Sequence, residues 1–308
     1  MRGRDLLSIA DLGPDEVDRI LKTALSLKRD GGGHDLLANK TLALLFEKPS
    51  LRTRVSFDVA MQELGGHAIY LNQSEVGLGQ REPVHDVARV LSRYVDVIAA
   101  RTYSHSTLLD LARHAGVPII NALSDEEHPC QAMADLLTVL ERFGTLRGVR
   151  LAFVGDGFNV AVSLAEAAAL AGMSFAMAAP SGYSIPEPTL RLIRELAAKN
   201  GAQIDTYDTA AEAVRGADVV YTDVWASMGQ EDTYAQRKEA FAGFAITTEI
   251  MALAKPGAIF MHDLPAHRGE EVMDDVIEGP QSVVFDQAEN RLHAQKAILA
   301  LTTSDHDL

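Results

Sequence analysis

The chain has 308 residues, of which 47% are hydrophobic and 23% are charged, and its formal net charge is −15. This composition is typical of a globular protein with an ordinary core, and the length suggests two domains. The acidic net charge argues against nucleic acid as a partner, because a phosphate backbone requires a basic face.

The first half of the chain alternates between helical and strand patterns. A first helix begins at Pro14, carries an apolar stripe from Val17 to Ala24 and ends at Gly31–Gly33. We then expect strands at 41–46, 67–71, 95–101 and 117–122, and helices at 50–64, 83–94, 106–116 and 128–144. This alternation predicts a parallel sheet with helices on both faces.

The alternation restarts after "GTLRGVR", residues 144–150, which is the expected domain boundary. We expect strands at 149–157, 173–180, 202–207, 217–225 and 258–265. We expect helices at 159–172, 187–200, 210–215 and 287–301, and one more that ends near Ala254. The predicted fold class is α/β, with two doubly wound parallel-sheet domains joined by two interdomain helices. The expected domains are 1–143 and 144–285, with 286–308 forming a C-terminal helix that packs back on the first domain.

An arginine-rich stretch, "SLRTR", stands where the first strand leads into a helix. Ser50 is at the expected N-cap and Thr53 at the third helical position, so both lie at a helix end that attracts anions. Arg52 and Arg54 in the first turn oppose the helix dipole, which a purely structural interpretation does not explain. The stretch therefore predicts a phosphate site.

Two further motifs follow predicted strands. In "HPCQ", His128 and Gln131 lie three residues apart at a helix start and suit a carbonyl next to an NH₂ group, although a lone histidine there is more often a surface residue. The turn "VGDGFNVAV" lacks the third glycine and the later carboxylate of a dinucleotide fingerprint, which argues against NAD and leaves a tight turn with Asn159 as an N-cap or ligand contact.

Acidic and histidine side chains follow the last two predicted strands. Asp223 in "TDVWASMGQE" stands at the carboxyl end of a strand, where open α/β sheets bind ligands. "FMHDLPAHRGEE" holds two histidines and three acids, but their spacing matches no metal-ligand pattern and a proline interrupts it, so we expect no metal.

Five stretches taken in order resemble the aspartate/ornithine carbamoyltransferase family, and its ornithine-using members most closely. They are "SLRTR" (50–54), "HPCQ" (128–131), "DVWASMG" (223–229), "HDLP" (262–265) and "ENRLH" (289–293). The resemblance spans nearly the whole chain and implies transfer of a carbamoyl group from carbamoyl phosphate to the side-chain amine of L-ornithine. The products would be L-citrulline and phosphate, as in arginine metabolism.

The resemblance also implies roles for individual residues. Carbamoyl phosphate would bind to Ser50, Leu51, Arg52, Thr53, Arg101, His128, Gln131 and Arg291, with Arg54 as a further candidate. Ornithine would bind to Asn159, Asp223, Ser227, Met228, Asp263 and Leu264, and the catalytic residues would be Arg101, His128, Asp223 and Asp263. No cofactor or metal is implied, and the partners are the two substrates and further copies of the chain in a homotrimer or a multiple of it. The loop 76–83 would then reach a neighbouring site.

The sequence departs from the family pattern around the amino-acid pocket. Ornithine enzymes usually have "HCLP" where this chain has Asp263, and Phe158 and Val162 replace amides. A carboxylate near the attacking amine favours its protonated form, unless a raised pKa lets that carboxylate take the proton itself. Two alternatives therefore stay open: a carbamoyltransferase for a different amine, and a catalytically weak carbamoyl phosphate-binding relative. Aspartate as the acceptor is disfavoured, because Asp223 and Asp263 would repel a dicarboxylate.

The remaining features concern the compartment. The only cysteine, Cys130, rules out an internal disulfide and favours a reducing environment. No apolar run reaches the roughly 18 residues that span a bilayer, and the first residues lack the apolar segment of a signal peptide. We therefore expect a cytoplasmic protein without a membrane partner.

Overall fold

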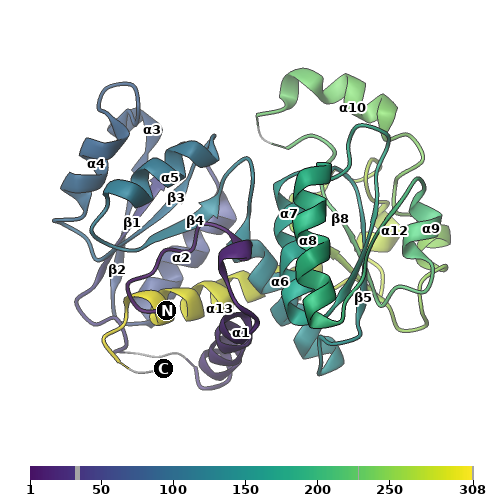
Figure 1. The fold of residues 1–308 in the computed structure, drawn as a ribbon, viewed down its shortest axis with the longest axis horizontal. Coiled ribbons are helices and arrows are strands. Elements are labelled where there is room, and N and C mark those ends of the chain that lie inside the picture. Colours follow the sequence, from purple (N-terminus) through teal and green to yellow (C-terminus); the bar gives the residue numbers. More distant parts are fainter. Residues whose placement is uncertain (32–34, 228, 307–308) are drawn as a thin grey trace. The chain divides into compact units, whose positions relative to one another are not determined.

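The structure is a computed structural model that describes residues 1–31, 35–227 and 229–306 (Figure 1). By its internal contacts the chain divides into two units. Unit 1 consists of Met1–Leu137 and Glu289–Leu308, and unit 2 of Thr138–Ala288. Two parallel sheets with flanking helices confirm the predicted α/β class. No helix within the described residues is both long enough and apolar enough to cross a membrane.

Unit 1 holds a four-stranded parallel sheet in the order β2-β1-β3-β4. Its strands are β1 (Thr41–Phe46), β2 (His67–Asn72), β3 (Val97–Arg101) and β4 (Ile119–Leu123). Its helices are α1 (Pro14–Arg29), α2 (Leu51–Glu63), α3 (Gln73–Val76), α4 (Val84–Leu91) and α5 (His105–His114), preceded by a short 3₁₀ helix, η1 (Ile9–Asp11). In Figure 1, α4 and α5 lie on one face of this sheet and α2 and α13 on the other.

Unit 2 holds a five-stranded parallel sheet in the order β7-β6-β5-β8-β9. Its strands are β5 (Arg150–Val154), β6 (Ser174–Ala178), β7 (Ile204–Tyr207), β8 (Val219–Thr222) and β9 (Ile259–His262). Its helices are α7 (Asn159–Ala171), α8 (Glu187–Asn200), α9 (Ala210–Val214), η2 (Glu231–Thr233), α10 (Tyr234–Ala240), α11 (Thr248–Met251) and α12 (Asp274–Ile277). In Figure 1, α7 and α8 cover one face of the sheet, and α9 and α12 lie on the other.

Two long helices contain the points at which the chain passes from one unit to the other. The first point falls between Leu137 and Thr138 inside α6 (Pro129–Phe143), and the second between Ala288 and Glu289 inside α13 (Val284–Thr303). Unit 1 is therefore built from two separate stretches of the chain.

Apolar runs and helix ends account for most of these elements. All but the first residue of β1 are buried, as the continuous run "TLALLF" predicts for a strand covered on both faces. Helix α1 begins with Pro14 after Gly13 and buries one stripe from Val17 to Leu27. Ser50 is the N-cap of α2, as predicted, and its hydroxyl accepts the Thr53 N–H.

Several boundaries differ from the expectation. The strand expected over 217–225 ends at Thr222, and the helix expected to end near Ala254 covers only Thr248–Met251. The expected helix 83–94 ends at Leu91, and the last helix begins at Val284 rather than at Gln287. Helices α3, α10 and α12 were not predicted, and neither α3 nor α10 buries a residue that would give an apolar signal.

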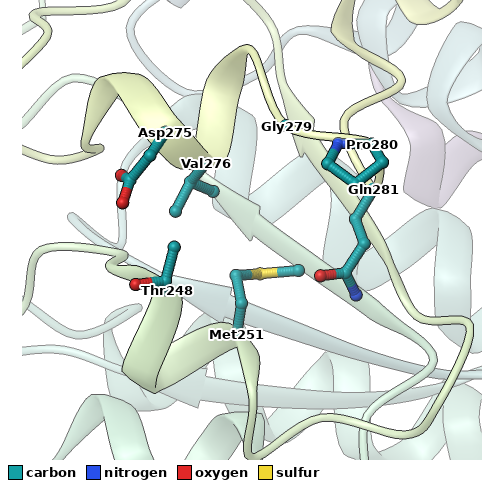
Figure 2. A pocket seen from close by; sticks show the side chains of 7 residues that line it. All are labelled: Thr248, Met251, Asp275, Val276, Gly279, Pro280 and Gln281. Carbon is teal, nitrogen blue, oxygen red and sulfur yellow. The ribbon is translucent and has the colours of Figure 1, made fainter.

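A small cavity lies in unit 2, beside α11 and α12 (Figure 2). Its volume is about 100 Å³, and Met251 and Gln281 are among its lining residues. Ligand pockets usually measure roughly 300–1,000 Å³, so this cavity is small for a substrate site.

Candidate active site

Among the described residues, most of the sequence-predicted site residues follow the carboxyl ends of strands or lie at the helix starts just beyond them, in each unit separately. In unit 1 the chain order reverses between β1 and β3, and in unit 2 between β5 and β8. Ligands of open α/β sheets bind at such switch points, because the loops there part in opposite directions. We call the two groups the anion half-site (unit 1) and the amino-acid half-site (unit 2), after the ligands that the sequence predicts for each unit by itself.

Strand pairing places the anion half-site. Arg101 ends β3 and stands opposite Phe46, the last residue of β1, and the Glu47 N–H donates to the Arg101 carbonyl at 2.8 Å. The turn that follows leads to Ser50, the N-cap of α2, and to Thr53 in its first turn. The next strand, β4, precedes His128 and the start of α6.

Arg291 of α13 joins the two helix starts. Its Nη2 donates to Thr53 Oγ1 and its Nη1 to Gln131 Oε1, both at 2.7 Å. The Ser50 hydroxyl donates to the same Thr53 oxygen at 3.0 Å, and Gln131 Nε2 donates to Asp135 at 2.8 Å. Thr53, Gln131, Arg291 and Asp135 are all buried, so their positions are fixed by protein contacts.

Positive charge surrounds a neutral imidazole in this half-site. Burial, followed by the charges of Arg291, Arg101 and Arg52, holds the pKa of His128 well below its usual value. The ring is therefore neutral at pH 7 and one of its nitrogens carries a proton to donate. Three guanidinium groups around a neutral donor suit an anion that carries a carbonyl group.

Two predicted residues of "SLRTR" stand apart from this network. The Arg54 guanidinium is exposed and lies over the Tyr70 ring, 4.0 Å from its centroid. The Leu51 side chain is 76% exposed, so this residue faces the half-site only through its backbone N–H at the helix start.

The amino-acid half-site also follows from strand register. Thr222 pairs with His262 across β8 and β9, so the next residues, Asp223 and Asp263, lie side by side. Carboxylate oxygens of this pair and a ring nitrogen of His262 all lie within 4.8 Å of one another. The spacing of these residues in the sequence did not predict this proximity.

The two carboxyl groups perturb each other. Burial, then the charge of Asp263 and a hydrogen bond with it, raises the pKa of Asp223 well above its usual value. The pair therefore shares a proton where two isolated carboxylates would both be ionised. The Val224 N–H donates to Asp223 at 2.6 Å and fixes the orientation of that carboxyl group.

His262 and Glu271 are buried next to the Asp223–Asp263 pair. His262 Nε2 lies 3.2 Å from Glu271 Oε1, and the Leu264 N–H donates to His262 Nδ1 at 2.9 Å. Burial alone would lower the pKa of His262, but hydrogen bonds with Asp263 and Glu271 outweigh burial and raise it. Leu264 has a φ of 60°, which is unfavourable for a residue with a side chain, so the surrounding contacts must hold this turn.

The other predicted residues of this half-site lie on two segments. Asn159 is buried and is the first residue of α7, whereas Phe158 is the N-cap, so the N-cap interpretation of Asn159 was wrong. Ser227 is half-buried in the loop after β8, and Met228 lies outside the described residues. Gly157 packs so closely that a Cβ would meet the Ile185 backbone nitrogen at 2.1 Å, which explains this glycine without a dinucleotide.

The sequence did not indicate several residues that hold the predicted ligand-binding side chains in place. Asp135 is one such residue, and its only sequence signal is the four-residue spacing from Gln131 along α6. Arg237 and Asp156 are two others, joined at 2.6 Å across 81 residues of chain, and no local pattern indicates that pairing.

The chain matches two family models that together cover most of it. Residues 4–141 match "Aspartate/ornithine carbamoyltransferase, carbamoyl-P binding domain", and residues 147–302 match "Aspartate/ornithine carbamoyltransferase, Asp/Orn binding domain". Ornithine carbamoyltransferase from Pyrococcus abyssi is 52% identical over 304 residues, which are 98% of this chain and 96% of the relative.

Solved structures agree with this match. Ornithine carbamoyltransferase from Pyrococcus furiosus superposes with a TM-score of 0.96 at 51% identity, covering 99% of each chain. An acetylornithine transcarbamylase complexed with acetylcitrulline has a TM-score of 0.90 at 30% identity, covering 98% of this chain and all of the other.

Proposed function

The chain belongs to the aspartate/ornithine carbamoyltransferase family, and from this premise we propose that it carbamoylates L-ornithine. In the proposed reaction the side-chain amine of ornithine attacks carbamoyl phosphate and yields L-citrulline and phosphate. Its relatives with about half of their residues identical over nearly the whole chain carry the corresponding name.

The observation that carries the proposal is the anion half-site. Arg52, Arg101 and Arg291 place three positive charges around His128, which stays neutral because burial and these charges lower its pKa. A dianionic phosphate fits the charges, and the carbamoyl oxygen fits a neutral N–H donor. The Gln131 amide, oriented by Asp135, is matched to the carbamoyl NH₂ group.

The amino-acid half-site favours a cationic acceptor. Asp223 and Asp263 are held together in a partly buried setting, and an ammonium group relieves their repulsion. Ornithine carries an α-ammonium for Asp223, whereas N-acetylornithine carries none. Aspartate would bring two further carboxylates to this pair and is therefore disfavoured.

The chemistry needs only these side chains. A new C–N bond forms as the C–O bond to the phosphate breaks. The side-chain ammonium loses one proton before it attacks, and its nitrogen loses a second as the bond forms, which the departing phosphate takes. Binding of the α-ammonium displaces the proton shared by Asp223 and Asp263 to solvent, and Asp263 is then free to accept the first proton of the side-chain ammonium. Arg101 and His128 stabilise the developing oxyanion, and the loss of one such donor costs about 10²–10³ in rate. No metal or redox cofactor takes part in these steps.

We also propose that the protein forms a homotrimer and is cytoplasmic. Leu51 and Val55 of α2 and Ile69 of β2 are exposed apolar side chains of unit 1, and a second copy of the chain in a trimer would cover them. The single cysteine, Cys130, is buried, which suits the reducing cytoplasm.

The test is an assay of acceptor-dependent phosphate release from carbamoyl phosphate with three acceptors: ornithine, N-acetylornithine and aspartate. We expect ornithine to exceed the others by at least about 100-fold in kcat/KM, the effect of losing one or two charge-assisted contacts. The variant Asp223→Asn should lose ornithine turnover and keep carbamoyl phosphate binding in calorimetry. Equal turnover of N-acetylornithine, or no binding of carbamoyl phosphate by the parent chain, would contradict the proposal.

A further inference from the structure

A largely shielded, part-buried ion pair links the two segments that carry the amino-acid half-site. Arg237 of α10 donates from Nη1 to Asp156 Oδ2 at 2.6 Å and to the Trp225 carbonyl at 3.0 Å. Only 13% of the Arg237 side chain and 11% of the Asp156 side chain are exposed. Asp156 belongs to the turn after β5, and Trp225 to the loop after β8.

Asp156 extends the connection further along the same loop. It also forms a hydrogen bond with the Gln230 side chain, whose Oε1 accepts the Ser227 N–H at 3.0 Å. Residues 225, 227 and 230 are therefore all linked, directly or through one side chain, to the turn that precedes Asn159. We call Arg237 and Asp156 the clamp.

Aromatic rings pack against the clamp and against Trp225. The Arg237 guanidinium lies over the Tyr183 ring, 5.1 Å from its centroid, and the Trp225 ring stacks on Phe241 at 5.6 Å with an interplanar angle of 17°. Arginine suits this position, because its planar group stacks on a ring while its N–H groups bond in the plane. The loop after β8 is thus attached to α10 by both its backbone and its tryptophan.

We propose that Arg237 and Asp156 are positioning residues that set the distance between Asn159 and Ser227, and hence the affinity for the amino-acid substrate. The proposal rests on the proposed function for the identity of that substrate. Neither residue needs to touch the substrate, since the clamp acts through the backbone of the two segments. Its loss should therefore weaken amino-acid binding and leave carbamoyl phosphate binding unchanged.

The test compares Arg237→Met and Asp156→Asn with a matched control on the same helix. Lys238→Met removes a neighbouring charge whose side chain is 54% exposed and pairs with Glu270 at 2.8 Å. We expect both clamp variants to raise the KM for ornithine about 10–100-fold, the effect of one charge-assisted hydrogen bond, with kcat changed only a few-fold. The double variant should raise KM no more than the worse single variant, because both changes break the same link.

Fluorescence gives a readout that does not depend on turnover. Trp225 is the only tryptophan of the chain and is buried. Arg237→Met should shift its emission to longer wavelength and increase its quenching by acrylamide, whereas Lys238→Met should do neither. Arg237→Lys keeps the charge but loses the planar stacking group, so it should show smaller changes in the same direction and serves if Arg237→Met fails to fold.

Unchanged ornithine KM and unchanged Trp225 emission in Arg237→Met, or changes equal to those in Lys238→Met, would overturn the clamp. A parent chain that makes no citrulline, combined with altered Trp225 emission in Arg237→Met alone, would instead refute the proposed function and leave the clamp standing. A changed affinity for carbamoyl phosphate in both clamp variants would also overturn it, because the effect would then not be confined to the amino-acid half-site.

Discussion

Replacing Asp263 by asparagine should stabilise the protein, and the gain should increase with pH. The pKa of Asp223 is raised by burial and by Asp263, so the folded protein holds a proton that the unfolded chain releases. This contribution is complete below about pH 3.9, the ordinary aspartate value, and is lost as the pH rises through the folded pKa. At higher pH the wild-type pair carries two facing negative charges, and Asp263→Asn removes one of them.

The size of the effect follows from the separation of the two carboxyl groups. Their oxygens lie within 4.8 Å, where two unit charges repel by about 3.5 kcal/mol at an effective dielectric constant of 20 and by about 0.9 kcal/mol in bulk water. For a unit of this size, 1 kcal/mol corresponds to roughly 2–4 °C in Tm. Asp263→Asn should therefore raise Tm by about 2–14 °C where both wild-type groups are ionised.

The groups next to the pair also make the stabilisation by Asp263→Asn larger at high pH than at low pH. His262 has a raised pKa, so its positive charge favours Asp263 over asparagine in acid, and this attraction is lost as the pH rises through the pKa of His262. Glu271, which also faces the pair, is the same in both proteins. The gain in Tm of Asp263→Asn over wild type should therefore be smallest near pH 5.

The assay is thermal unfolding at pH 5 and pH 9, followed by circular dichroism for wild type, Asp263→Asn and Asp208→Asn. Asp208 is an exposed carboxylate of unit 2 and serves as the matched control. A constant Tm difference between Asp263→Asn and wild type at the two pH values would refute the reasoning, as would the same pH-dependent gain in Asp208→Asn.

Three further predictions concern the anion half-site and the assembly. Arg291→Met should weaken carbamoyl phosphate binding about 10–100-fold, since Arg291 supplies a charge beside Thr53 and Gln131; calorimetry measures this, and an unchanged Kd would contradict it. His128 should be neutral at pH 6.5, the ordinary histidine pKa, because burial and three arginines lower its pKa, and a proton resonance of His128 that titrates near pH 6.5 would contradict this. If the proposed trimer forms, Ile69→Glu places a charge on an exposed apolar position and should lower the mass in solution from that of wild type towards the 33.3 kDa of one chain; light scattering measures this, and an unchanged mass would exclude Ile69 from the proposed interface.

The fold was largely predictable because its signals are local. A continuous apolar run such as 41–46 predicts a strand covered on both faces, and Pro14 or Ser50 marks a helix start by local geometry. Helices α3 and α10 escaped prediction because they bury none of their residues and therefore show no apolar stripe. The strand predicted over 217–225 was longer than the observed one. Asp223 and Val224 follow β8 but do not pair with its neighbouring strands.

The half-sites depend on pairings between distant residues, which a single sequence does not contain. Ser50 and Thr53 were identified from a helix start, but the bond from Arg291 to Thr53 joins residues 238 apart. The approach of Asp263 to Asp223 requires the register of β8 against β9. The link from Arg237 to Asp156 requires the placement of α10, an element that was itself not predicted.

The discontinuity of unit 1 has a consequence for how the chain matures on the ribosome. Met1–Leu137 emerge first, but Glu289–Leu308, which carry Arg291 and the buried Lys296 partner of Glu63, follow only after the whole of Thr138–Ala288. At roughly 5–20 residues per second, synthesis of that insertion takes about 8–30 s. During this interval the nascent first unit lacks the end of α13 that completes it. A chain truncated before Glu289 should therefore fail to bind carbamoyl phosphate and should be bound by chaperones or degraded by proteases.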